Sequence, residues 1–422
     1  MDNIVKKYST DKKIKFSANI TRVSVYSALI WCIVAVLLTS ILRDMLFSYI
    51  NWFFGGTLLV LLTFILAKSK RRVILLGILV ALILVHLPGS YDISREIKDS
   101  MNWLSCIEFL MLCCDQKSLN KIQGYLERSE TLIKYVLYIY TIELLTIMML
   151  PSAYTYAWGS RVFTAYNAVQ GTAANCCLYI AIALYYIGVF NNGIQNARKI
   201  IQKNLFILFG ILLNLAAIIM TQIRTVLFSV LAAMVLFIMI LFKDNVKRFL
   251  VFIISGLLGI IVLLNSDGFR AKMLYSIQQL SFAGFTALDA LLSSRPIIWK
   301  RLLTYFWKED SFFNYLFGSG FARVYEINIV YGNGRNINAH SDIIHTFIGF
   351  GITGLSVMLI YSFRMLSFKT KQDWLGSLVL LLFAIIPEAI NGIMMTPSHV
   401  YSVLFIILVL NILHIRRNTR YA

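Results

Sequence analysis

Arginine and histidine side chains gather in one long polar segment of this sequence, residues 266–341. The segment contains Arg295, then a Gly-Ser-Gly turn, and it ends shortly after His340. A guanidinium group presents a planar fork of N–H donors that binds phosphate oxygens in pairs. An imidazole with a pKa near neutrality can remove a proton from a hydroxyl group. These residue types predict a reaction in which a phosphorylated compound is held while a hydroxyl group is activated.

His340 stands at the start of the apolar run that follows, where Ser341 or Asp342 can cap the expected helix. His345 lies five residues further on, about 140 degrees around a helix, so the two histidines are not expected to act as a pair or to share a metal. A histidine at a helix start is also often a hydrogen-bonded structural residue. Spacing alone leaves both interpretations open, and no carboxylate stands out as a partner.

Two further arginines stand near the ends of apolar runs, where a charged side chain is expensive and marks a candidate site. Arg224 lies between two such runs, and Arg161 precedes the run from 171 to 190. Residues 171–175 are unusually polar for a segment that enters lipid, so we expect them to face the protein interior. The alternative for each arginine is a side chain that extends to the lipid headgroups without further function.

Arg295 and Trp299 are four residues apart, so on a helix they share a face. Pro296 suits the first turn of that helix. The functional interpretation directs Arg295 into a cavity, with Arg301 as supporting charge. The structural interpretation is a loop helix that is capped by a preceding serine and packs Trp299 against the apolar runs.

The composition describes the elements that must position these side chains. Hydrophobic residues make up 59% of the 422 positions and charged residues 14%, against about 25% charged residues in soluble domains. The sequence therefore predicts an all-α membrane protein that crosses the bilayer many times. The net charge of +19 does not indicate nucleic acid binding, because the basic residues lie between apolar runs as membrane topology requires. The six cysteines lie in or beside apolar runs without metal-ligand spacing, so no metal site is expected.

About 20 apolar residues cross the hydrocarbon as a helix that satisfies its own backbone. On this basis the sequence predicts twelve spans, of which the fourth is short and carries Glu108. The expected spans are residues 24–42, 50–67, 73–88, 100–114, 132–150, 171–190, 204–222, 225–242, 249–265, 342–363, 375–391 and 398–414.

The distribution of Lys and Arg predicts the orientation of these spans. Of the 39 Lys and Arg residues, 26 fall in segments on one side, and 5 fall in the short loops on the other side. Basic residues concentrate on the cytoplasmic side of membrane proteins, so the tails 1–23 and 415–422 are expected in the cytoplasm. Spans one to nine occupy 24–265 and the last three occupy 342–414. The loop 266–341, with short helices of its own, is then expected on the outer face.

An outer location limits the chemistry. No ATP is available there, and the sequence has no Gly-rich phosphate-binding motif with Lys. Any reaction must therefore use a substrate that arrives already activated. A polyprenyl diphosphate fits, because its tail lies in the bilayer while its diphosphate lies at the surface, where arginines at helix ends can meet it.

The order of these motifs resembles the large external loop and following helix of the O-antigen polymerase and O-antigen ligase superfamily. Twelve spans with the long loop between the ninth and tenth are typical of that family. The resemblance covers residues 161–355, while the first five spans contribute topology only. The motifs that carry it are Arg295 with Trp299, Phe317–Phe321, His340-Ser341 leading into Phe347–Leu355, Arg224 with Thr225, and Arg161 followed by Asn175.

The resemblance implies a metal-independent, inverting glycosyltransferase of the GT-C type that uses no cofactor. A hydroxyl group of an acceptor glycan would attack the anomeric carbon of a sugar chain carried on undecaprenyl diphosphate, and the lipid diphosphate would leave. His340 would be the catalytic base. Arg224 and Arg295 would hold the diphosphate and stabilise its developing charge, with Arg161 and Arg301 as further diphosphate-binding candidates. The supporting residues would be Trp299, Gly318, Gly320, Ser341 and Asn175.

This sequence departs from the family pattern at two positions. Where many members have Asn after the histidine, it has Ser341. Where a Pro-Asn pair is common in the sixth span, it has Ala174-Asn175.

Two activities of the family share this transfer chemistry and differ in acceptor. A polymerase, which we prefer, uses another lipid-linked repeat unit, whereas a ligase uses the lipid A core. A flippase for lipid-linked oligosaccharides is an alternative of another class, and a scaffold protein a third. The expected location is the bacterial inner membrane with the active site on the periplasmic face. The expected partners are the undecaprenyl-diphosphate-linked oligosaccharide as donor and acceptor, the lipid bilayer, and possible chain-length regulator and flippase proteins, but no nucleic acid.

Overall fold

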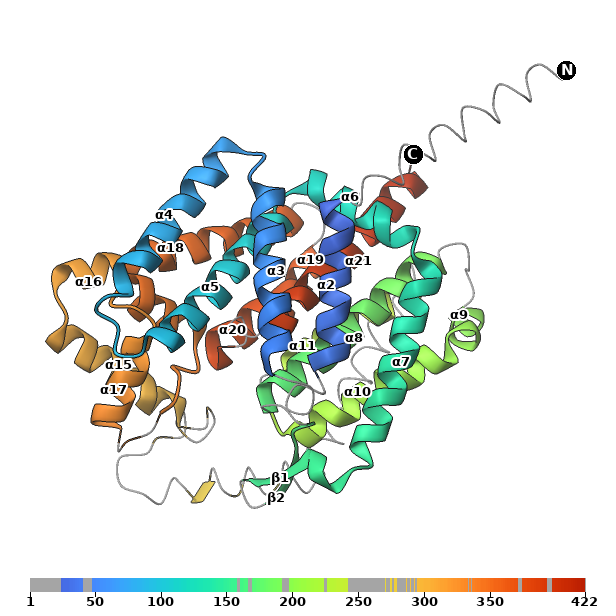
Figure 1. Cartoon of the computed structure of the whole chain (residues 1–422). Helices are drawn as coiled ribbons and strands as arrows, with labels where there is room; N and C mark the ends of the chain where they lie inside the picture. Colours follow the sequence, from blue (N-terminus) through green and yellow to red (C-terminus); the bar gives the residue numbers. More distant parts are fainter. Residues whose placement is uncertain are drawn as a thin grey trace, which may run out of the picture.

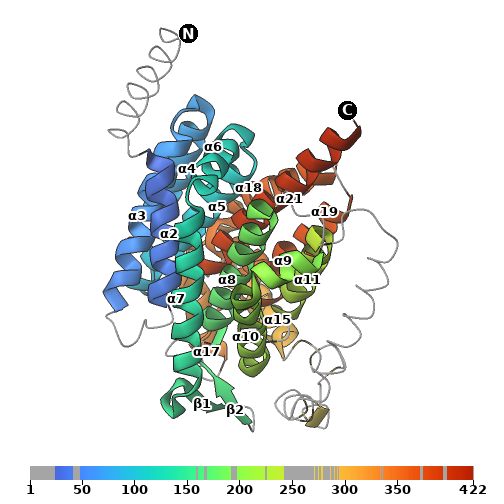
Figure 2. The ribbon, with the colours of Figure 1, turned by 90° about the vertical axis from the view of Figure 1, so that its right-hand side faces the viewer.

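The described residues fold into packed helices and one small hairpin (Figures 1 and 2). The computed structural model describes residues 24–40, 48–157, 160–165, 169–191, 197–223, 226–241, 270, 274, 277–278, 286, 289, 292, 294–332, 334, 336–370, 374–392 and 397–421.

The N-terminal half builds most of the main core. Its elements are α2 (Val25–Ser40), α3 (Ser48–Leu66), α4 (Lys70–His86), α5 (Ile93–Cys113), α6 (Gln116–Glu127), α7 (Glu130–Met148), a 3-10 turn (Pro151–Ala153), β1 (Tyr154–Ala157), β2 (Ser160–Phe163), α8 (Val169–Phe190), α9 (Ala197–Lys203), α10 (Leu205–Thr221) and α11 (Val226–Leu241).

The C-terminal half contains the loop helices and the last apolar helices. Its elements are α15 (Arg295–Glu309), α16 (Phe312–Phe317), α17 (Ala322–Tyr331), α18 (Asp342–Thr370), α19 (Trp374–Leu380), the π-helical turn η2 (Leu381–Ile385), α20 (Ile386–Asn391) and α21 (Pro397–Tyr421).

Helix α8 lies at the centre of the main core. It is buried from Thr172 to Gly188 and packs against α21, α10, α11 and α7. A helix that is largely apolar on all sides must be buried or face lipid. Helix α8 is buried. Thr172 to Asn175 are buried, as their polarity predicted.

A second, smaller core joins the loop helices to the start of α18. Leu302 and Phe306 of α15 pack there against Val324 and Ile327 of α17 and against Ile348 of α18. The region between 295 and 341 is therefore a packed unit rather than an extended connector.

The helix predicted around Arg295 is present as α15. Pro296 lies in its first turn, as predicted. Ser294 occupies the N-cap position, but its side chain makes no capping hydrogen bond to the helix. A left-handed backbone at Ser294, with φ of 62°, changes the direction of the chain at this point.

Helices occupy each predicted span except 249–265, which lies outside the described residues. Three of them, Glu130–Met148, Val169–Phe190 and Asp342–Ser367, are long and apolar enough to cross a membrane. Several others are shorter apolar helices, and together they support an integral membrane protein. The number of spans and the side on which 266–341 lies stay predictions.

The segment from Pro88 to Ser100, expected as a loop between two spans, is a loop only in its first part. Helix α5 begins at Ile93, and Asp92 caps it by accepting a hydrogen bond from the N–H of Arg95 over 3.1 Å. The charged residues in its first turns indicated a solvated loop. They are tolerated in a helix because partners distant in sequence pair with them.

Candidate functional site

The Gly-Ser-Gly turn and the break in α18 are two halves of one contact. Gly351 has a φ of 62° and interrupts the helix. A break of this kind makes carbonyl groups of the preceding turn available to other donors. The N–H of Ser319 donates to the carbonyl of Ile348 over 2.8 Å, and the N–H of Gly320 donates to that of Gly349 over 3.1 Å. Two sequence motifs thirty residues apart therefore form one joint between the loop and α18.

Gly318 is expected to tolerate no side chain. Its φ is 86°, and a Cβ there would lie 2.1 Å from the carbonyl oxygen of Gly349. We expect Gly318→Ala to lower the free energy of unfolding by roughly 2 kcal/mol or more, through backbone strain and the clash together. Gly334→Ala is the matched control, because its φ is 72° with no atom within 4 Å of the Cβ position. If thermal unfolding shows that the two purified variants lose the same stability, this would contradict a clash at Gly318.

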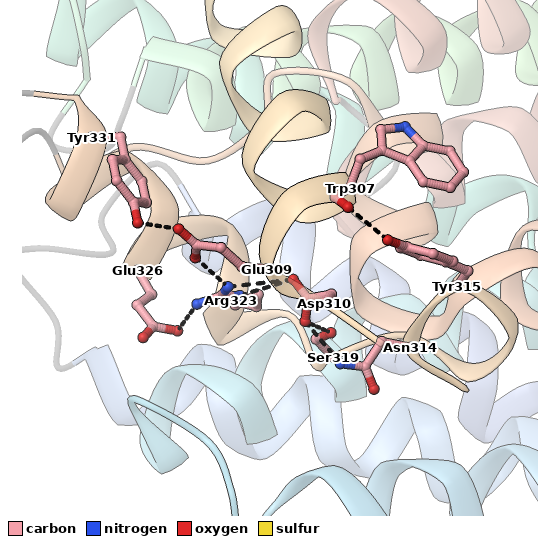
Figure 3. Close-up of polar contacts among 9 residues, drawn as sticks. All are labelled: Trp307, Glu309, Asp310, Asn314, Tyr315, Ser319, Arg323, Glu326 and Tyr331. Carbon is pink, nitrogen blue, oxygen red and sulfur yellow. Dashed lines mark hydrogen bonds and ion pairs between the residues drawn. The ribbon is translucent and has the colours of Figure 1, made fainter. Parts of the chain in front are cut away.

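Arg323 on α17 ties the end of α15 to α17 (Figure 3). Its guanidinium group binds Glu309 over 2.8 Å, Asp310 over 3.3 Å and Glu326 over 3.0 Å. Asp310 also accepts a hydrogen bond from the hydroxyl of Ser319 over 2.6 Å. This network fixes the Gly-Ser-Gly turn relative to α15 and α17.

The first turns of α5 form a buried polar surface that holds α17 and α18. The carboxylate of Glu96 is buried and accepts a hydrogen bond from the N–H of Ala322 over 2.7 Å, at the start of α17. A negative charge is stabilising at that end of a helix. Asp99 accepts a hydrogen bond from Tyr325 Oη over 2.8 Å, and its Oδ2 lies 3.6 Å from Nε2 of His345. His345 is thus engaged with α5.

Removing the charge of Glu96 is expected to loosen this attachment. Glu96→Gln keeps an acceptor oxygen but loses the favourable charge at the start of α17, at a cost of about 1 to 2 kcal/mol. Thermal unfolding of the purified protein measures the loss. Glu127→Gln, an exposed position on α6, is the control and should change stability little. A Glu96→Gln variant as stable as that control would show that the charge is not needed.

Arg295 and Trp299 extend from one face of α15, as their spacing predicted. The guanidinium group of Arg295 donates to the last turn of α20, where its acceptors are a backbone carbonyl and Oδ1 of Asn391. The indole N–H of Trp299 donates to the carbonyl of Ala339 over 2.8 Å. One face of α15 therefore positions both the end of α20 and the residue before His340.

His340 occupies an unfavourable backbone conformation. Its φ of 49° lies in the left-handed region, which costs about 1 kcal/mol or more for a residue with a side chain. The N–H of His340 donates to Oδ1 of Asn338 over 3.1 Å. Ser341 is buried, and its hydroxyl accepts a hydrogen bond from the N–H of Ile344 over 3.4 Å, so Ser341 is the one of the two candidate residues that caps α18. Strained positions of this kind gather at functional sites.

The surroundings of His340 favour a neutral imidazole. Burial of the ring, together with the neighbouring Arg295 and His345, lowers the pKa of His340 from 6.5 to about 4. The side-chain amide of Gln170, at the start of α8, lies 3.4 Å from Nδ1. The atom of Gln170 that faces the ring is Nε2, which can only donate, so Nδ1 of a neutral His340 accepts this hydrogen bond.

The end of α20 lies beside the backbone of His340. Gly392 has a φ of 65°, and a Cβ there would lie 3.3 Å from Oδ1 of Asp342 and 3.5 Å from the carbonyl carbon of His340. Glu388 and Asn391 are buried on α20, and among the described residues Glu388 Oε2 and Asn391 Nδ2 have no hydrogen-bond partner. Buried polar atoms without partners require an explanation. Their position next to a histidine and an arginine makes this a candidate binding site.

The other predicted diphosphate-binding arginines are placed differently. Arg224, with Thr225, lies outside the described residues. Arg161 lies on β2, where its guanidinium group is exposed, stacks over the ring of Tyr154 at 4.1 Å and donates to the carbonyl of Pro151 over 3.4 Å. Both contacts are local to the hairpin. The described contacts do not bring Arg161 to His340.

Arg301 and Asn175 also lie apart from His340 in the described contacts. The guanidinium group of Arg301 lies against Gly332, at the end of α17. Six residues on a helix turn its side chain well away from the face of Arg295. Asn175 is buried on α8, and neither atom of its amide has a partner among the described residues.

Several residues near the site were not singled out from the sequence. Glu388 carried a signal, because it is the single carboxylate in the span predicted at 375–391, and an ionisable residue within a span marks a candidate site. Glu96 and Asp99 could also have been identified from the sequence, since they share a helix face with the buried Trp103. Gln170 and Asn391 carried none, because their contacts join segments far apart in the sequence.

The described residues contain no group of three His, Cys, Asp or Glu side chains arranged to hold a metal ion. Residues 209–359 match the family model described as O-antigen ligase. The match begins in α10, ends in α18 and includes Arg295, the Gly-Ser-Gly turn and His340. No curated protein matches the chain.

Proposed function

We propose that this chain, whose residues 209–359 carry the O-antigen ligase family domain, is a polymerase that joins oligosaccharide units carried on undecaprenyl diphosphate. The family match supports an enzyme of the O-antigen ligase and polymerase type that uses lipid-linked oligosaccharide at a membrane. The observation that carries the finer proposal is the placement of Arg295 and His340 beside the same end of α20. A group that binds phosphate and a group that accepts a proton then meet at one place.

In the proposed reaction, the neutral imidazole of His340 removes the proton from an acceptor hydroxyl group. The hydroxyl oxygen forms a bond to the anomeric carbon of the donor sugar, from the face opposite the diphosphate. The bond between that carbon and the diphosphate oxygen breaks with its electron pair, and undecaprenyl diphosphate leaves. Negative charge grows on the leaving group, and Arg295, already oriented by α20, stabilises it together with Arg224. The configuration at the sugar is inverted.

The proposed location follows from the charge distribution along the chain. With 26 of the 39 Lys and Arg residues on the side of the tails, the loop helices and His340 face the periplasm. The donor arrives there already activated, so the reaction needs no nucleotide. The chain-length regulator and the flippase that the family implies would act on the same face or deliver the substrate to it.

The polymerase is preferred over the ligase, which shares the transfer chemistry and differs in its acceptor. Deletion of the gene distinguishes the two activities. Single repeat units attached to lipopolysaccharide are expected for a polymerase, whereas an undecorated core with accumulated lipid-linked polymer would indicate a ligase.

A flippase is the alternative from another class. A transporter is expected to place charged groups along a central cavity and to bind its substrate between two repeated halves. Here Arg295 and His340 lie where the loop helices meet α18 and α20. The central helix, α8, is surrounded by the mostly apolar side chains of the main core. These observations favour the enzyme.

The pH dependence of the reaction is expected to reflect the lowered pKa of His340. The base must be neutral, so kcat/KM should fall as the pH drops toward about 4 rather than toward 6.5. Removing the positive charge in Arg295→Gln should raise the pKa and move the acid limb to higher pH. Bound diphosphate should also raise the pKa of His340. The acid limb of the kcat profile should therefore lie at higher pH than the acid limb of the kcat/KM profile. An acid limb that is unchanged by Arg295→Gln would contradict the electrostatic effect of Arg295 on His340.

A further inference from the structure

Helix α16 carries aromatic side chains that the described part of the chain leaves uncovered. Phe312 and Phe313 are each 68% exposed, and Phe317 is 41% exposed. Trp307, near the end of α15, is 56% exposed. A cluster of large exposed apolar side chains marks a contact with another apolar surface.

The helices that hold α16 in place expose apolar faces of their own. Nε2 of His86, the last residue of α4, lies 3.0 Å from the carbonyl oxygen of Phe317. On α18, the hydroxyl of Thr353 donates to the carbonyl of Leu316 over 2.7 Å. The exposed apolar side chains on these two helices include Leu84 and Val85 of α4 and Ile352 and Phe363 of α18.

The contact with α18 lies within a helix that qualifies as a membrane span, Asp342–Ser367. Thr353 lies inside this apolar span, two residues beyond the break at Gly351. In Figure 1, α16 lies beside α4 and α18, at a height between the two ends of α2 and α3. Helix α16 is therefore level with the apolar helices and does not project beyond them.

The charged residues that precede α16 are paired, which lowers the cost of placing this segment near lipid. Glu309 and Asp310 both bind Arg323 (Figure 3). Asp310 also accepts a hydrogen bond from Nδ2 of Asn314, on α16 itself, over 2.8 Å. The polar groups turn toward the loop helices, while Phe312 stays exposed. An unpaired carboxylate would be expensive at this position.

We propose that α16 lies within one leaflet of the bilayer, with Phe312 and Phe313 among the lipid acyl chains and Trp307 at the level of the headgroups. Aromatic side chains concentrate at that boundary in membrane proteins. The contact anchors the loop helices at a fixed depth, and with them the segment that carries His340. That this is the outer leaflet rests on the proposed function, whereas the lipid contact itself does not.

Site-directed fluorescence tests the lipid contact without any assay of activity. The environment-sensitive fluorophore NBD is attached to Phe313→Cys, and in a separate sample to Val330→Cys on α17. Val330 is the matched control, because it is 60% exposed and apolar, on helix α17, which lies below α16 in Figure 1. The native cysteines among the described residues are buried or half-buried, and labelled wild-type protein supplies the background.

Both samples are reconstituted in vesicles of phosphatidylethanolamine and phosphatidylglycerol. A lipid with a nitroxide near the top of its acyl chain should quench the label at 313 several-fold more than the label at 330, and iodide in the water should do the reverse. Equal quenching by iodide at both positions would place α16 in water. Protection of the label at 313 from both quenchers would indicate a second copy of the chain or another protein. Either result would overturn the proposal.

Discussion

Replacement of His340 by alanine is expected to abolish glycosyl transfer while the protein stays in the membrane. Loss of a general base typically slows a reaction by about 10²–10⁴. The measurement is the rate of polymer formation by purified protein. Retention of long-chain product in this variant would refute the role of His340 as the base.

The backbone of His340 makes a second variant necessary. Its φ of 49° suits alanine poorly, so a defect in His340→Ala has two possible causes. Asparagine tolerates the left-handed region better than other residues with a side chain, and its amide is no base at neutral pH. We expect His340→Asn to unfold at nearly the wild-type temperature and still be inactive. An active His340→Asn variant would show that only the backbone conformation matters.

Substitution of Arg295 is expected to have the next largest effect. Arg295→Ala should lower kcat by about 10²–10³, the usual cost of removing a donor that stabilises developing negative charge. Arg295→Lys keeps the charge but loses the planar fork, so it should retain only part of the rate. The test measures kcat for each variant with a defined lipid-linked substrate. Full activity in Arg295→Lys would contradict recognition by two parallel N–H groups.

Variants of two other arginines distinguish a local role of Arg295 from a general effect of losing positive charge. Arg161 lies on an exposed hairpin, and Arg301 lies against Gly332. Their alanine variants are expected to lose much less activity than Arg295→Ala. Because Arg295 also holds the end of α20, its variants are compared for thermal stability as well. If the loss of folding stability in Arg295→Ala accounts for its whole loss of activity, Arg295 has a structural role alone.

Much of the helical architecture was predictable from the sequence because hydrophobic runs of span length have few alternatives in lipid. Helices lie at the predicted spans within the described residues, and the shared face of Arg295 and Trp299 follows from their spacing alone. Ser341 caps α18 as its residue type predicted. These features depend on local chemistry, which a sequence displays directly.

The rest of the site depends on contacts between distant segments, which the sequence does not display. Glu96 meets the start of α17 across more than two hundred residues, so its charge suggested a solvated loop instead of a buried contact. Gln170 reaches His340 from α8 in the same way. Arg161 illustrates the opposite case. Its place before a span suggested a phosphate site, whereas its described contacts are those of a β-hairpin.

The most direct test of the central claim is an assay of the purified full-length protein, reconstituted in vesicles, with a synthetic undecaprenyl-diphosphate repeat unit as the only substrate. Product length is resolved on a gel, and free undecaprenyl diphosphate is quantified, with and without a chelator. The proposed function predicts a ladder of polymers, one lipid diphosphate released for each bond formed, no dependence on the chelator, and no product with His340→Asn. Movement of the substrate across the membrane without polymer or released lipid diphosphate would contradict it.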